Sequence, residues 1–181
     1  MGATRKRVLV LFAHPALERS RVNRELSRDV GKLDGVTFHD LYEAYPDFDV
    51  DVKREQAMLL EHDIIVMQHP LFWYSTPALL KQWEDLVLQH GWAYGSHGTA
   101  LYGKKVLSAI TAGGSKAAYQ HDGYHQTTID ELLLPIKKTA NLCGMEYLPP
   151  FVVYGTLDMT SARMKEHAAD YRRKLEELVE G

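Results

Sequence analysis

The sequence predicts an α/β fold in which helices cover both faces of a doubly wound parallel sheet of five strands. Short apolar runs alternate with helix-like patterns along the whole chain, and this alternation is typical of such sheets. The runs are continuous stretches of Val, Leu and Ile, which indicates strands buried on both faces. Since the chain has 181 residues and is 45% hydrophobic, we expect a single domain over residues 1–181.

The first part of the chain predicts two strands and a helix. Residues 7–13 include an uninterrupted apolar run and are expected to form the first strand. A helix should cover residues 21–33, because Ser20 is a good N-cap and apolar side chains recur with helical spacing after it. Residues 36–40 are expected to be the second strand.

The second part predicts two further helices around the third strand. A loop at residues 43–50 leads into a charged helix near residues 51–61, and the third strand is expected at residues 64–68. Thr76 and Pro77 should open the next helix, with Thr76 as N-cap and Pro77 in the first helical position. Its expected apolar face consists of Leu79, Leu80, Trp83, Leu86 and Val87.

The third part begins with a long surface loop, which we expect at the glycine- and aromatic-rich residues 91–103. The fourth strand should cover residues 105–111. Thr128 and Glu131 have the spacing of a capping box and predict the start of a helix that ends at Cys143. Cys143 lies on the apolar stripe of that helix, so we expect a buried thiol rather than a nucleophile.

The last part predicts the fifth strand at residues 147–154, weakened near its start by Pro149 and Pro150. An amphipathic helix should close the chain at residues 161–180. Five strands that alternate with helices favour the strand order 2-1-3-4-5, which is the flavodoxin-like arrangement.

Charge and composition exclude several classes of protein. With 21 Lys and Arg against 24 Asp and Glu, the formal net charge is -3, and a general nucleic-acid binder would usually be basic. The single cysteine excludes an internal disulfide and a CxxC motif. No stretch approaches the ~18 apolar residues of a transmembrane helix. We therefore expect a cytoplasmic protein without a nucleic-acid partner.

The loop after the first strand is a candidate anion site, because ligands of open α/β sheets bind beyond the carboxyl ends of the strands. It contains no GxGxxG, so a dinucleotide-binding turn is not indicated. A helix start offers free N–H groups to an anion, and His14, Ser20 and Asn23 can add hydrogen bonds around Arg21 and Val22. One phosphate would fit; a capped helix that binds nothing is an equally good interpretation.

The loop after the third strand is rich in aromatic residues. Leu71, Phe72, Trp73 and Tyr74 lie between two prolines, which suggests a planar ligand held by stacking and backbone hydrogen bonds. A plug in the core or a dimer contact is the alternative for each single aromatic side chain.

The loop after the fourth strand carries two glycines and two candidate donors. Paired glycines allow a backbone to approach a flat ring closely. Tyr119 and His125 follow and together can donate to an anion that develops on a ligand. His121 has no third partner for metal binding, so no metal site is expected. The segment itself is Thr111, Ala112, Gly113 and Gly114.

Taken together, these segments resemble the flavin-dependent NAD(P)H:quinone oxidoreductases of flavodoxin-like fold. The resemblance covers nearly the whole chain. Within this family, the chain is most similar to the ancillary oxidoreductases of glutathione-gated potassium-efflux systems. It rests on AHP with a later SxxN, on QHPLFWYSTPALLKQWED, on HGWAYG, on TAGG and on LYEAYPDFDVD. Any one of them is a weak signal, whereas all of them at these spacings are a specific one.

The resemblance implies FMN as the cofactor, with FAD less expected, and NADPH or NADH as co-substrate. It implies that His14 and residues 20–23 hold the phosphate, that residues 71–74 follow the isoalloxazine edge, and that residues 111–114 approach its pyrimidine side. Tyr119 and His125 match by position a pair that stabilises charge on the reduced flavin in animal DT-diaphorases. The potassium-efflux ancillary proteins do not uniformly keep this pair.

The implied reaction has two steps: a nicotinamide gives hydride to the flavin and leaves, and a quinone or a similar small acceptor then takes hydride in the same place. The resemblance further implies a homodimer in which an aromatic loop, here residues 92–102, contributes to the pocket. A regulatory subunit of a potassium-efflux antiporter, peripheral on the cytoplasmic face of the membrane and with a mainly structural flavin, is the alternative. A flavodoxin-like electron carrier is less favoured, because that class tends to be strongly acidic.

Overall fold

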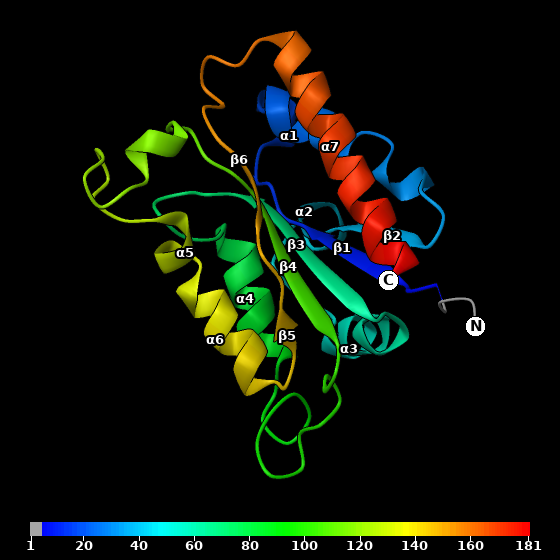
Figure 1. Ribbon diagram of the computed structural model, residues 1–181. Coiled ribbons are helices and arrows are strands. Elements are labelled where there is room, and N and C mark those ends of the chain that lie inside the picture. Colours follow the sequence, from blue (N-terminus) through cyan, green and yellow to red (C-terminus); the bar gives the residue numbers. More distant parts are fainter. Residues whose placement is uncertain (1–4) are drawn as a thin grey trace.

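The computed structural model describes residues 5–181, and in it helices flank both faces of a twisted parallel sheet (Figure 1). Residues 1–4 of the expected domain lie outside this range. The strands follow the order β2-β1-β3-β4-β5, and a short β6 also pairs with β4. The predicted fold class and strand order are therefore confirmed, with a sixth strand added.

The central strands owe their burial to the continuous apolar runs. All five residues of β1 (Val8–Phe12) and all seven of β3 (Ile64–Pro70) are buried. β2 (Val36–Asp40) covers one side of this pair and β4 (Lys105–Thr111) the other, all in parallel register. β3 runs two residues further than predicted, because His69 and Pro70 still pair with β4.

The predicted fifth strand is wrong in one respect, since it is interrupted. β5 (Glu146–Tyr147) pairs with the beginning of β4 and β6 (Phe151–Val153) with its end. Pro149 and Pro150 lie between the two, and a proline has no N–H to donate to the ladder. The chain therefore follows the same edge of β4 in two short pieces.

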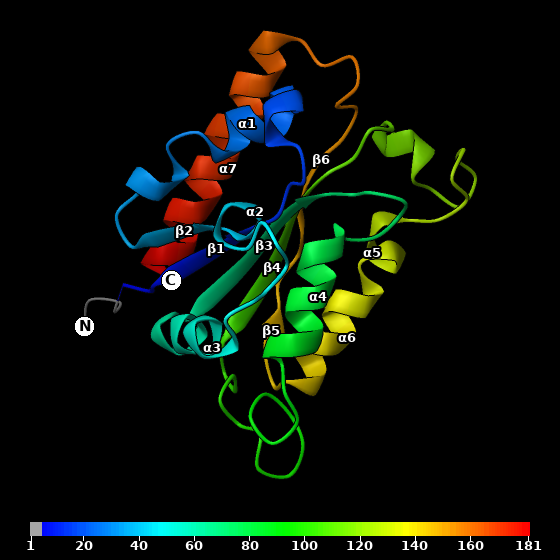
Figure 2. The same cartoon turned by 180° about the vertical axis from the view of Figure 1, so that it is seen from behind.

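One face of the sheet is covered by α1 (Arg21–Ser27) and the long α7 (Ser161–Glu180), as both Figure 1 and Figure 2 show. Apolar side chains of β1 and β3 pack there against Tyr171 and Leu175 of α7, which are 1% and 0% exposed. The predicted last helix is thus confirmed, and Thr160 caps it through the N–H of Arg163.

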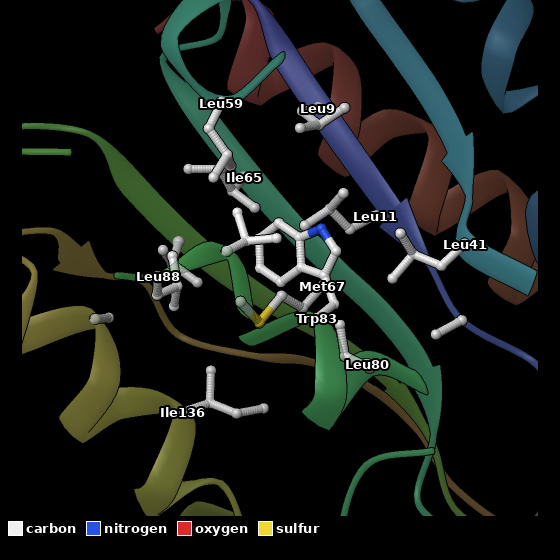
Figure 3. Packing of buried hydrophobic residues seen from close by; sticks show 14 of the residues in the cluster. Leu9, Leu11, Leu41, Leu59, Ile65, Met67, Leu80, Trp83, Leu88 and Ile136 are labelled. Atoms are coloured by element: carbon white, nitrogen blue, oxygen red, sulfur yellow. The ribbon is translucent and has the colours of Figure 1, made fainter. Parts of the chain in front are cut away.

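The remaining α-helices cover the opposite face of the sheet. They are α2 (Leu41–Ala44), α3 (Val52–Glu61), α4 (Ala78–Val87), α5 (Ile129–Leu132) and α6 (Leu134–Leu142). Figure 3 shows side chains of β1, β3, α3, α4 and α6 converging around the Trp83 indole, which is 1% exposed. Cys143 is buried beside this cluster, as expected, and burial raises the pKa of its thiol. Leu86, expected on the apolar face of α4, is 40% exposed.

The helix predicted over residues 21–33 is shorter than expected, because α1 ends at Ser27. Arg28 is extended and Asp29 has a left-handed φ of 63°, a conformation that Asp tolerates better than most residues. A short 3₁₀ turn at Val30–Lys32 follows and buries Val30 against the sheet.

Prolines explain why two further helices differ from their predicted boundaries. The capping box of Thr128 and Glu131 is confirmed, but α5 stops after one turn. Pro135 lacks the N–H that would continue the helix toward Glu131, and α6 starts anew at Leu134. Pro77 occupies the cap position of α4, so Thr76 is not the N-cap. Within residues 5–181 no helix is both long and apolar enough to cross a membrane.

Candidate functional site

The carboxyl ends of β1, β3 and β4 meet at one end of the sheet (Figure 1). Residues of the loops that follow β3 and β4 line an open cavity there. Its volume is about 470 Å³, within the range of small-molecule sites. Seven of the predicted site residues line it, which are Leu71, Trp73, Tyr74, Gly113, Gly114, Tyr119 and His125. Three residues that the sequence analysis did not identify complete the wall, namely Ala118, Tyr124 and Leu157.

The aromatic loop forms a tight turn. The backbones of Phe72 and Ser75 exchange hydrogen bonds of 3.1 and 2.9 Å, and the two residues between them have φ values of 49° (Trp73) and 62° (Tyr74). Turns with two positive φ angles normally use Asn or Gly, so two bulky aromatic residues here carry backbone strain. The turn holds the Trp73 side chain 90% exposed at the mouth of the cavity.

The glycine turn forms the opposite wall. A Cβ atom on Gly114 would lie 3.1 Å from both Nε2 of His125 and Cε2 of Tyr119, so glycine keeps room for these two rings. The turn is tied to the end of β6, since the N–H of Ala112 donates to Val153 and the N–H of Gly155 donates to Gly114, both at 2.8 Å. Both walls are therefore anchored on the sheet.

His125 lies among three tyrosines. Its ring stacks on Tyr119 with a centroid separation of 4.3 Å and meets Tyr74 and Tyr124 edge-on at 5.5 and 5.2 Å. The Tyr74 hydroxyl and Nδ1 of His125 are 3.2 Å apart. Burial raises the pKa of Tyr119, so its phenol keeps its proton at neutral pH and can act as a donor. The two predicted catalytic residues are thus brought into direct contact.

The first loop is tied to the third by a hydrogen-bonded network. Ser20 caps α1 by accepting from the N–H of Asn23 at 3.2 Å. The Asn23 side chain, 4% exposed, donates to the hydroxyls of both Ser20 and Thr111 at 3.0 Å. The amide of Asn23 is therefore engaged inside the protein, and its hydrogen bond to Thr111 joins the start of α1 to the end of β4.

His14 connects the first loop with the aromatic turn. Its Nδ1 accepts from the N–H of Ala16 at 3.1 Å, so Nε2 carries the proton when the ring is neutral. Burial lowers the pKa of His14, which keeps the ring neutral near pH 7. Its ring meets Phe72 edge-on at 5.8 Å. Nε2–H of His14 is accordingly a neutral donor in the loop that leads from β1 to α1.

Several predicted site residues can reach a ligand only through their backbone. The side chains of Val22 and Ala112 are buried in the two cores, and that of Thr111 is bonded to Asn23. Arg21 is exposed at the first position of α1. The N–H groups of Arg21 and Val22 have no acceptor in their own helix, as at any helix start.

The arrangement suits a flat aromatic group with an anionic tail. The ring would enter between the aromatic turn and the glycine turn, and the tail would reach the free N–H groups that follow Ser20. The part of the chain that the structure describes contains no cluster of three His, Cys, Asp or Glu side chains for a metal.

Of the three cavity residues that were not predicted, Leu157 is the one that the sequence could have indicated. It lies in the loop that follows β6, and its side chain is 3.5 Å from the place of a Cβ on Gly113. The rule that ligands bind beyond the carboxyl ends of the strands applies to this loop as well. Tyr124 and Ala118 carried no such signal, because their places depend on how the loop between β4 and α5 folds.

A protein-family model described as the flavodoxin-like fold matches residues 6–175. The uncharacterized NAD(P)H oxidoreductase YrkL of Bacillus subtilis is 49% identical over 90% of this chain and 93% of its own length. The glutathione-regulated potassium-efflux system ancillary protein KefF of Enterobacter sp. strain 638 is 43% identical over 93% of this chain and 94% of its own.

Two solved structures are similar over nearly their full lengths. The general stress protein 14 of Treponema denticola, in complex with FMN, gives a TM-score of 0.91 at 39% identity and covers 95% of this chain and 99% of its own. An NADPH-quinone reductase of P. pentosaceus gives a TM-score of 0.84 at 34% identity, with 93% and 96% covered.

Proposed function

Because the chain belongs to the flavodoxin-like fold family, we propose that it is an FMN-dependent NAD(P)H:quinone oxidoreductase. The observation that carries this proposal is the cavity between the aromatic turn and the glycine turn, with Tyr119 and His125 on its wall. The FMN complex of the Treponema denticola relative supports the flavin. The names of the Bacillus subtilis and P. pentosaceus relatives support the nicotinamide and the quinone.

The donors of the first loop fit the phosphate of FMN. His14 offers Nε2–H, and the backbone N–H groups at the start of α1 offer further hydrogen bonds beside the Ser20 hydroxyl. Hydrogen bonds to a charged acceptor are about twice as strong as neutral ones. The FMN complex of the Treponema denticola relative favours FMN, whose tail ends in a single phosphate, over FAD. The proposed phosphate-binding residues are His14, Ser20, Arg21, Val22 and Asn23.

The two turns fit the ring of FMN. Leu71, Phe72, Trp73 and Tyr74 would follow one edge of the ring, and Gly114 leaves a slot that a Cβ would narrow. The backbone of Thr111, Ala112, Gly113 and Gly114 would approach the pyrimidine side with its N–H and C=O groups. A bound ring would cover the apolar and aromatic walls of this open cavity and shield the hydrogen bonds made beneath it from water.

Tyr119 and His125 are the proposed catalytic residues. Bound FMN would supply hydride transfer from NADH or NADPH to a quinone, which would also take up one proton and leave as the hydroquinone. The Tyr119 phenol and the His125 ring would donate hydrogen bonds to the negative charge that accompanies reduction. Because the nicotinamide and the quinone use the same cavity in turn, no separate dinucleotide-binding motif is needed.

A homodimer would complete the pocket. The loop of residues 91–103 lies at the amino-terminal end of β4, far from the carboxyl-end loops of its own chain (Figure 1). Trp92 and Tyr94 pack against the core of their own chain, whereas Tyr102 is 60% exposed and could reach a flavin cavity only in a second copy. We propose this loop as the contribution of the partner subunit.

A regulatory role is the second candidate, and the similarity to the potassium-efflux ancillary protein KefF favours it. In this role the protein would lie in the cytoplasm, bind an antiporter at the inner face of the membrane and keep flavin mainly as a structural group. The two roles are compatible. Turnover of a quinone by the purified FMN-loaded protein separates a catalytic flavin from a structural one.

A titration with flavin tests the proposal. The purified protein should bind FMN at one per chain, and FAD more weakly, measured by the change in flavin fluorescence. Replacing Ser20 and Asn23 together with Ala should weaken FMN binding at least tenfold, because the start of α1 loses its N-cap and its hydrogen bond to Thr111. Ser27→Ala, at the other end of the same helix, is the matched control and should leave the affinity unchanged. Absence of saturable FMN binding would refute the proposal.

A further inference from the structure

The Tyr74 hydroxyl is the single hydrogen-bond partner of the His125 ring within residues 5–181, at 3.2 Å from Nδ1. A phenol is a better donor than acceptor, because its oxygen lone pairs are delocalised into the ring. A bare imidazole nitrogen, in turn, is a good acceptor. The favourable arrangement therefore has Tyr74 donating to Nδ1.

This arrangement decides which nitrogen of His125 carries the proton. In a neutral imidazole one nitrogen accepts and the other donates, so a donor at Nδ1 leaves the hydrogen on Nε2. Nε2 is the atom that faces Gly114, since a Cβ on this glycine would lie 3.1 Å from it. The N–H of His125 is thus turned toward the slot between the two walls of the cavity.

We propose that Tyr74 is a positioning residue that fixes His125 as the Nε2–H tautomer and thereby aims a neutral donor at a ligand oxygen or nitrogen beside Gly114. The inference rests on the proposed function for the identity of that ligand. It assigns Tyr74 a role beyond lining the ring, because the effect passes through its hydroxyl and not through its aromatic face.

The strained turn supports this role. Tyr74 has a φ of 62° and follows Trp73 with a φ of 49°, in a turn closed by the Phe72–Ser75 backbone pair. Bulky residues persist in this conformation only where the surroundings impose it, and such positions cluster at functional sites. The turn is what brings a hydroxyl from the end of β3 to a histidine of the loop after β4.

Nitrogen-15 NMR of the histidine rings in the flavin-free protein tests the inference, at a pH where the rings are neutral. Two other histidines calibrate the spectrum. His14 accepts at Nδ1 from Ala16 and must show the Nε2–H form, whereas His69 donates from Nδ1 to the Pro70 carbonyl and must show the opposite form. His125 should show the pattern of His14.

Tyr74→Phe removes the hydroxyl and keeps the ring, so a fraction of the Nδ1–H form of His125 should appear in this variant. Tyr124→Phe is the matched control. It also alters a ring edge-on to His125, but no hydrogen bond of its hydroxyl is found in the described part of the chain, so the tautomer should not change. A wild-type His125 in the Nδ1–H form, or an unchanged spectrum in Tyr74→Phe, would overturn the inference.

The FMN-loaded protein provides a second readout. Tyr74→Phe should slow flavin reduction about fivefold, the equivalent of one neutral hydrogen bond. If the tautomers behave as expected but the protein is never reduced by NADH or NADPH, the proposed function fails and this inference stands. If NADH or NADPH reduces the flavin normally but Tyr74→Phe leaves the tautomers unchanged, this inference fails and the proposed function stands.

Discussion

At the scale of single residues, two carboxylates of this chain show how opposite environments set opposite pH dependences. Glu55 of α3 is 1% exposed and accepts hydrogen bonds from His39, Tyr45 and Trp83 at 2.9, 2.5 and 2.8 Å. Burial alone would raise its pKa, but these donors hold it below the usual value. Glu84 of α4 lines a groove against α6, and burial without comparable donors raises its pKa to about 7.

Glu55→Gln should destabilise the protein by about 3 kcal/mol at pH 7, because an amide cannot accept from all three donors and leaves buried groups unpaired. Chemical denaturation measures the loss. Since the pKa of Glu55 is lowered on folding, its contribution is present above pH 4.5 and fades as the pH falls through the folded value. Glu61→Gln, in an exposed pair with Arg7, should change the stability by less than about 0.5 kcal/mol. Equal effects of both variants at pH 7 would contradict this account.

Glu84→Gln should have the opposite sign. The folded protein keeps the proton of Glu84 up to a pKa of about 7, so the contribution of this group to stability is fully present below pH 4.5 and is lost as the pH rises from there through 7. At pH 8 the variant should be more stable than the wild type by about 2 kcal/mol, and at pH 4 the two should be equal. Thermal unfolding at the two pH values checks this. The exposed Glu176→Gln should differ from the wild type equally at both pH values. If the difference in stability between Glu84→Gln and the wild type were the same at pH 4 and pH 8, the account of Glu84 would be contradicted.

At the scale of elements, local features of the backbone explain where the sequence-based predictions were wrong. Helices α1, α5 and α6 are shorter or split because a left-handed Asp29 and the missing N–H of Pro135 intervene within otherwise regular apolar stripes. The aromatic turn was placed correctly, but its two positive φ angles were not foreseeable, because neither Trp73 nor Tyr74 is a residue that favours them. The spacing of apolar residues predicts which face of an element is buried, but it does not predict a strained turn.

Trp73→Gly tests the strain in the turn. Glycine adopts a positive φ freely, and the Trp73 side chain is 90% exposed, so little burial is lost. The variant should be more stable than the wild type by about 1 kcal/mol in chemical denaturation, while it binds FMN more weakly. Trp73→Ala separates the two effects, because it removes the ring but keeps the Cβ and therefore the strain. If Ala stabilised the protein as much as Gly, backbone strain would not be the cause.

At the scale of the whole molecule, the alternation of apolar runs and helical patterns was sufficient to predict the sheet and its order, because each crossover is local in the sequence. The three candidate loops of the site were predicted from the rule that ligands of open α/β sheets bind beyond the carboxyl ends of the strands. Contacts between distant segments could not be predicted from the sequence. Asn23 contacts Thr111, and Tyr74 contacts His125, only once the sheet is assembled. The roles of the site residues, the homodimer and the single domain remain predictions.

Anaerobic absorption spectroscopy of the FMN-loaded protein tests the central claim most directly. The account predicts that one equivalent of NADPH or NADH bleaches the flavin band at about 450 nm and that one equivalent of a quinone restores it. A band that neither nicotinamide bleaches, or that stays bleached after a quinone is added, would contradict an enzyme that passes hydride across this cavity.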